Sequence, residues 1–173
     1  MKRALTASVA LTLLAAAAAM AHPHFNKTVI AKLPSGVDAT ITYNTTPANE
    51  IHAAKAAVGT FVTPRRPLLK LSGEIKTGAV TIPAGEYTVG VIKNSETDWT
   101  MALYPGAIPR GGEAVDVAKA IKLESLFSTA QGTAEHMLLD ISPGDGKLEG
   151  RAVLTLHFGH LFLAGALSDK IAN

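Results

Sequence analysis

Apolar and polar residues alternate along several short stretches of the chain. In residues 37–44, apolar side chains occupy every second position, and the same alternation recurs in residues 86–94, 99–106 and 152–158. A period of two residues is typical of a strand that buries one face. We therefore expect these apolar positions in the core: Val89, Val91, Trp99, Met101, Leu103, Leu154, Leu156 and Phe158.

Polar and glycine-rich segments separate the predicted strands. The polar run 94–98 (NSETD) indicates a hairpin between two of them, and a Pro-Ala-Gly turn spans residues 83–85. Short strands at similar spacing predict an all-β fold, an antiparallel β-sandwich of the jelly-roll or Ig-like type, with roughly seven to nine strands.

One segment has the pattern of a helix instead. Thr46 is a candidate N-cap, Pro47 suits the first helical position, and Glu50 lies in the first turn. The following residues are rich in alanine, and Gly59 is a natural end. These signals predict one short helix over residues 47–58.

The first residues have the pattern of a secretory signal peptide. Lys2 and Arg3 precede an apolar run over residues 4–20, and Ala19 and Ala21 are the small residues that signal peptidase requires. An uncleaved membrane anchor is disfavoured, because alanine gains little on leaving water. We expect residues 1–21 to be removed, leaving residues 22–173 as a single domain in the periplasm or medium.

Loss of the signal peptide changes the charge balance. Removing Lys2 and Arg3 from the 16 basic residues leaves 14, equal to the 14 acidic residues. A neutral chain without a basic cluster is not expected to bind nucleic acid or to insert into a membrane after cleavage. The chain has no cysteine, which excludes disulfides and thiolate chemistry.

Three motifs resemble a family of exported bacterial domains, domain-of-unknown-function family 2911. They are TITYNTTPA (40–48), VTIPAGEYTVGVI (80–92) and DWTMALYPG (98–106), and the closing LTLHFGHLFLAGAL (154–167) is similar to the family's last hairpin. The resemblance implies a β-sandwich and export, and no activity. Residues 60–73, TFVTPRRPLLKLSG, stand where the family usually carries WRxGANE, so no site residue can be transferred.

The sequence lacks the common catalytic patterns. It contains no GxSxG, HExxH or SxxK motif and no nucleotide-binding glycine loop. His157 and His160 are three residues apart in a predicted strand, where they point to opposite faces. His160 is in phase with Phe158 and the core, so we expect one interior and one surface histidine rather than a metal site.

The predicted mature chain begins His22-Pro23-His24. A free N-terminal histidine offers its α-amine and Nδ1 to copper when another histidine supplies a third nitrogen. This is similar to the histidine brace of polysaccharide mono-oxygenases and periplasmic copper carriers. Pro23 has no amide proton, so His24 can serve only as an ordinary imidazole ligand. The alternative is a frayed stub left by cleavage.

Two functional hypotheses follow. The favoured one is an exported, non-catalytic domain that binds a small molecule or an envelope protein and needs no cofactor. The second is a copper-binding protein or copper-dependent oxidase, with His22, His24 and His52 as ligands, ahead of His136. Sugar binding is less favoured, because only 5% of residues are aromatic.

Overall fold

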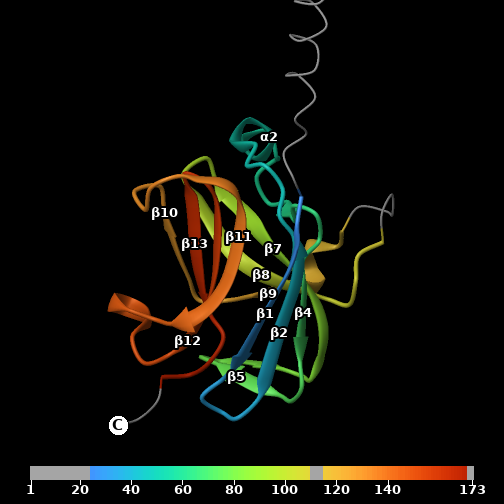
Figure 1. Cartoon of the computed structure of the whole chain (residues 1–173), viewed down its shortest axis with the longest axis vertical. Coiled ribbons are helices and arrows are strands. Elements are labelled where there is room, and N and C mark those ends of the chain that lie inside the picture. Colours follow the sequence, from blue (N-terminus) through green and yellow to red (C-terminus); the bar gives the residue numbers. More distant parts are fainter. Residues whose placement is uncertain (1–23, 110–114, 171–173) are drawn as a thin grey trace, which may run out of the picture.

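The computed structural model describes residues 24–109 and 115–170, and it confirms an all-β, sandwich-like fold with one short α-helix (Figure 1). The larger sheet has the order β1-β2-β4-β7-β8-β9, with β3 also paired to β7, and all its pairings are antiparallel. Its strands are β1 (Asn26–Lys32), β2 (Asp38–Asn44), β3 (Phe61–Val62), β4 (Leu68–Leu71), β7 (Gly85–Ser95), β8 (Asp98–Pro105) and β9 (Ile121–Lys122).

The second sheet has the order β10-β13-β12-β11, also antiparallel. Its strands are β10 (Ser125–Ser128), β11 (Ala134–Pro143), β12 (Ala152–Gly159) and β13 (Leu161–Ala166). A separate hairpin pairs β5 (Ile75–Thr77) with β6 (Val80–Ile82), and two 3-10 turns are η1 (Val117–Lys119) and η2 (Gly146–Leu148). The thirteen strands of the described residues exceed the predicted number because several are only two or three residues long.

The core lies between the two sheets. All eight predicted core residues are buried, from Val89 to Phe158. The sheets approach each other closely at Gly165, where an added Cβ would lie 2.8 Å from the Met101 side chain. A larger residue there would force the sheets apart, so β13 and β8 depend on this glycine for their packing.

Both predicted turns lie between consecutive strands. Residues 94–98 include the turn between β7 and β8, which pair directly. The 83–85 turn separates β6 from β7, but these strands pair with different partners. Here the Tyr87 hydroxyl donates a hydrogen bond to the Pro83 carbonyl at 2.7 Å, which closes the turn through a side chain.

The predicted helix is shorter than expected. Helix α2 spans Glu50–Ala54, and its N-cap is Asn49, whose side-chain oxygen accepts a hydrogen bond from the His52 amide. The prediction of a Thr46 cap was wrong because Pro47 instead bridges to His136 on the neighbouring sheet. In the described part of the chain, no helix is long and apolar enough to cross a membrane.

Candidate functional site: a groove beside helix α2

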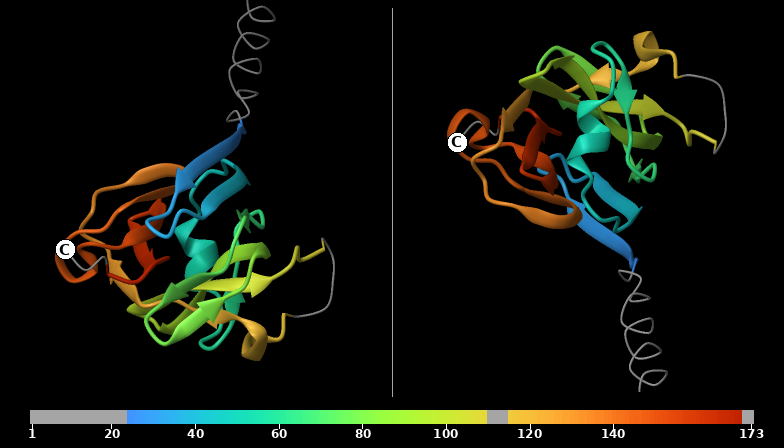
Figure 2. Two further views of the ribbon diagram at one scale, coloured as in Figure 1. Left: turned by 90° about the horizontal axis from the view of Figure 1, so that it is seen from below. Right: turned by 90° about the horizontal axis from the view of Figure 1, so that it is seen from above.

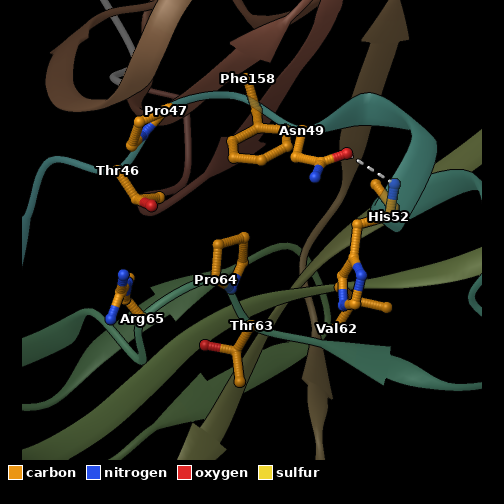
Figure 3. A pocket seen from close by; sticks show the side chains of 10 residues that line it. Thr46, Pro47, Asn49, His52, Val62, Thr63, Pro64, Arg65 and Phe158 are labelled. Carbon is orange, nitrogen blue, oxygen red and sulfur yellow. Dashed lines mark hydrogen bonds between the residues drawn. The ribbon is translucent and has the colours of Figure 1, made fainter. Parts of the chain in front are cut away.

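Helix α2 lies across one end of the sandwich, between the two sheets (Figure 2). Beside it is a groove of about 390 Å³, drawn in Figure 3. Its residues come from the segment before α2, from α2, from β3 and the stretch after it, and from the end of β12. They are Thr46, Pro47, Asn49, His52, Ala53, Val62, Thr63, Pro64, Arg65 and Phe158.

One wall of the groove is a loop that interrupts a strand. Both β3 and β4 pair antiparallel with β7, so they are two parts of one strand path along β7. Residues 63–67 leave this path opposite Val89 and Gly90. The loop is held by Val89, whose amide donates to the Pro67 carbonyl at 2.8 Å and whose carbonyl accepts from the Thr63 hydroxyl at 2.7 Å.

The tip of this loop has an unusual backbone. Arg65 and Arg66 have φ angles of 56° and 50°, in the left-handed region. An L-residue pays roughly 1–2 kcal/mol for this conformation, and a hairpin usually places Asn or Gly there. Strain of this kind is concentrated at ligand-binding and catalytic sites in proteins. The loop therefore presents two arginines at an energetic cost.

Arg65 is the only charged residue among the described residues that line the groove. Its side chain is exposed, and neither Arg65 nor Arg66 forms an ion pair with any residue that the structure describes. An exposed guanidinium without a carboxylate partner creates a positive potential at this end of the groove. The site is therefore suited electrostatically to an anion.

The remaining walls are mostly apolar. The rings of Phe158 and Pro64 face one another across the groove, with Pro47 beside Phe158 (Figure 3). Phe158 is only 7% exposed, so it is anchored in the core while its ring borders the groove. This arrangement gives an apolar middle with hydrogen-bonding groups, such as Thr46, around it.

His52, a predicted metal ligand, lies in this groove. Its ring extends from α2 toward Val62, at the end opposite Arg65 (Figure 3). The side chain is exposed, and its position on α2 is set by the Asn49 cap. His52 thus supplies a second polar group to the groove, separated from Arg65 by the apolar middle.

A network of hydrogen bonds holds the start of helix α2 in place. Glu50 Oε1 accepts from the His160 amide at 2.7 Å and lies 3.0 Å from His160 Nδ1, while Nε2 of that ring is 2.9 Å from the Thr133 hydroxyl. A Cβ on Gly159 would collide with the Glu50 side chain. The amide hydrogen bond from His160 is the main reason that the pKa of Glu50 is lowered. Thr133, His160 and Glu50 are linked in the order hydroxyl, imidazole and carboxylate, as in a hydrolase triad. However, Thr133 and His160 do not line the groove.

Lys93 fastens the other end of α2. Its ammonium group donates to the carbonyls of Ala54 and Ala56, at 2.8 and 3.1 Å, and pairs with Glu96 at 2.8 Å. The Lys93 residue is 1% exposed, so these bonds replace the water that a charge requires. A cation at the last carbonyls also favours the helix dipole.

The predicted copper ligands are only partly described. His22 lies outside the described residues. His24 Nδ1 is 2.8 Å from the Thr45 carbonyl, and because a carbonyl only accepts, Nδ1 carries the proton and neutral His24 keeps a lone pair on Nε2. Thr45 immediately precedes the groove residue Thr46. No cluster of three or more metal-binding side chains occurs within residues 24–109 and 115–170.

The expectation for His160 was wrong. Phe158 pairs with Leu161, so Gly159 and His160 form a two-residue hairpin turn instead of continuing the strand. Gly159 has a φ of 65°, as the first position of a II′ turn requires. His160 is therefore exposed, while His157 stays in β12 and packs edge-on against Phe162.

The chain has no match among models of protein families, curated proteins or solved structures. The resemblance to family 2911 therefore stays a prediction. Arg65, the residue that gives the groove its charge, was not among the residues singled out from the sequence. The signal available was the pair of arginines enclosed by prolines in TPRRP (63–67).

Proposed function

We propose that this chain is an exported, non-catalytic binding module that holds an organic carboxylate in the groove beside α2. The observation that carries the proposal is Arg65, an exposed guanidinium without a described ion-pair partner, placed in the groove by a strained backbone. Stability alone favours Gly or Asn at such a position, so the presence of an arginine there supports a binding role.

The chemistry of the groove selects the class of ligand. A guanidinium presents two parallel N–H donors that match the two oxygens of a carboxylate. Phe158 and Pro64 would enclose an apolar or aromatic part of the ligand next to that group. A fully hydrated inorganic anion would leave these rings unused, so a small organic acid fits better.

The same residues favour binding over catalysis. Within the part of the chain that the structure describes, His52 is the only candidate general base that lines the groove, and no carboxylate among the lining residues orients it. The Thr63 hydroxyl already donates to the Val89 carbonyl, so it is not poised as a nucleophile. The groove thus has the means to hold an anion, without an assembled nucleophile and base.

Calorimetric titration with phenylacetate tests the proposal. We expect Arg65→Gln to weaken binding by about 10- to 100-fold, because a charge-assisted hydrogen bond contributes roughly 1.5–3 kcal/mol. Arg66→Gln is the matched control: it removes the same charge from the same turn, but Arg66 does not line the groove. Equal affinity for the neutral phenylacetamide, or equal losses in the two variants, would refute the proposal.

Copper binding is the second candidate, and the His24 hydrogen bond favours it. Histidines that bind metal usually donate their other ring N–H to a carbonyl or carboxylate, as His24 does to Thr45. His22 and His24 would then supply nitrogen ligands, which suit Cu(II). Adding one residue ahead of His22 displaces the α-amine and should abolish tight Cu(II) binding, whereas a site made of side chains would be unaffected.

A further inference from the structure

A small cavity lies directly beneath the groove. Its volume is about 20 Å³, and apolar side chains alone line it. It shares four residues with the groove, and these form the boundary between the two spaces: Ala53, Val62, Pro64 and Phe158. The groove and the cavity are therefore neighbouring compartments, an outer one with Arg65 and an inner one without charge.

The inner compartment reaches the core between the sheets. Its remaining walls include Val91 and Trp99 from the larger sheet and Leu156 and Leu163 from the smaller one. All four side chains are buried. A cavity without polar groups does not hold water well and accepts apolar ligands instead.

Helix α2 covers this compartment with little apolar contact of its own. None of its five residues is buried, and it contributes only Ala53 to the cavity wall. Ile51 on the same helix is 74% exposed. Polar contacts at the two ends, through Glu50 and Lys93, hold the helix in place. Opening this cover therefore exposes little apolar surface, and its main cost is the loss of these polar contacts.

We infer that the ligand is an amphiphilic carboxylate of the fatty-acid class, an inference that rests on the proposed function of the groove. The carboxylate binds Arg65, and the alkyl chain passes between Phe158 and Pro64 toward Trp99. The cavity widens as α2 and the Phe158 ring move outward to admit the chain. The charged end and the apolar interior are thus used by one molecule.

The wild-type chain provides its own probe, because Trp99 is the only tryptophan and lines the cavity. Butyrate, hexanoate, octanoate and decanoate, each below its micelle concentration, are titrated while Trp99 emission is recorded. We expect affinity to rise about four-fold for each added methylene until the cavity is filled. Trp99 emission should change with octanoate and decanoate and not with butyrate.

A matched pair of variants locates the alkyl chain. Val91→Ile adds one methyl group to the cavity wall. It should therefore reduce the increase in affinity from octanoate to decanoate. Val153→Ile makes the same change at a buried position of β12 that lines neither compartment. Thermal melting of both variants shows whether they fold. If Val91→Ile does not fold, the titration of the wild-type protein with acids of increasing chain length remains decisive.

The outcomes separate this inference from the proposed function. Arg65-dependent phenylacetate binding, with no effect of chain length and no change at Trp99, would overturn the inference and leave the proposed function standing. Octanol binding as tightly as octanoate would show adsorption of alkyl chains without Arg65 and overturn the inference. If neither phenylacetate nor the alkyl acids bind in a way that depends on Arg65, both the inference and the proposed function are overturned.

Discussion

Arg65 and Arg66 carry the same charge in the same turn, yet only Arg65 lines the groove. Both residues have a left-handed backbone, so the two share the same effect on stability. Comparing them therefore isolates the effect of the Arg65 side chain on binding. Such a pair allows the function of one side chain to be measured against its neighbour.

Replacing either arginine with glycine should stabilise the fold. Glycine adopts positive φ without the steric cost, so we expect Arg65→Gly and Arg66→Gly each to raise the free energy of unfolding by about 1 kcal/mol. Arg65→Gly should lose phenylacetate binding, whereas Arg66→Gly should keep it. Urea unfolding and calorimetric titration measure the two effects; a destabilised Arg66→Gly would show that the turn is not strained.

Glu50 makes stability depend on pH. Because hydrogen bonds from His160 lower its pKa below the ordinary 4.5, ionised Glu50 stabilises the fold above that pH. This contribution is lost as the pH falls through the lowered value. At pH 7, Glu50→Gln should therefore melt at a slightly lower temperature than wild type. The loss in unfolding free energy should be well under about 1 kcal/mol, because the side chain is 38% exposed.

The difference between Glu50→Gln and wild type should vanish in acid. Once the pH is below the lowered pKa of Glu50, the wild-type carboxyl is protonated and resembles the amide. Thermal melting at a series of pH values measures this trend. A gap that stays constant from pH 7 down to the lowest pH at which the protein still folds would contradict the role assigned to the charge.

Tyr87 tests the turn before β7. Burial raises the pKa of its hydroxyl, which therefore stays protonated and donates to the Pro83 carbonyl at neutral pH. Tyr87→Phe keeps the ring and leaves that carbonyl without its donor. We expect a loss of about 1 kcal/mol in unfolding free energy, measured in urea; no loss would mean that water replaces the hydroxyl.

At the scale of elements, alternation identified the strands that bury one face. β2, β8 and β12 each place apolar residues in the core at every second position, so their pattern was sufficient. β1 was missed because it is an edge strand with most of its side chains exposed, including Ile30. A strand without a buried face has no period-two signal.

The groove could not be predicted in the same way. The 63–67 loop exists because β3 and β4 pair with one strand, β7, at two separate places. The paired residues are 14 (Leu71 and Gly85) to 31 (Phe61 and Ile92) positions apart in sequence, and this pairing leaves no local pattern. His52 was named from the sequence only as a possible metal ligand. Its place opposite Arg65 depends on the Asn49 cap, which was missed because Thr46 and Pro47 gave a stronger local helix signal.

At the scale of the whole molecule, the two sheets form a closed core and α2 lies over one end of it (Figure 2). The sheets supply rigidity, while the helix and the 63–67 loop supply the groove. A binding site at the end of a sandwich can vary without disturbing the core. This separation explains how strained arginines are tolerated beside well-packed strands.

Export also concerns the whole molecule. If residues 1–21 are a signal peptide, the secreted form should begin at His22. Intact mass spectrometry of protein recovered from the periplasm should give the mass of residues 22–173. A mass that includes Met1 would contradict export and would remove the free amine on which the copper alternative depends.

The central claim is that Arg65 binds the carboxylate of the ligand. The most direct measurement is nuclear magnetic resonance of the arginine side-chain Nε–H groups during titration with decanoate. We predict that the Arg65 resonance shifts with saturation, while the resonances of Arg66 and of Arg151, which pairs with Glu124, remain in place. An unchanged Arg65 resonance at saturating decanoate would contradict the account.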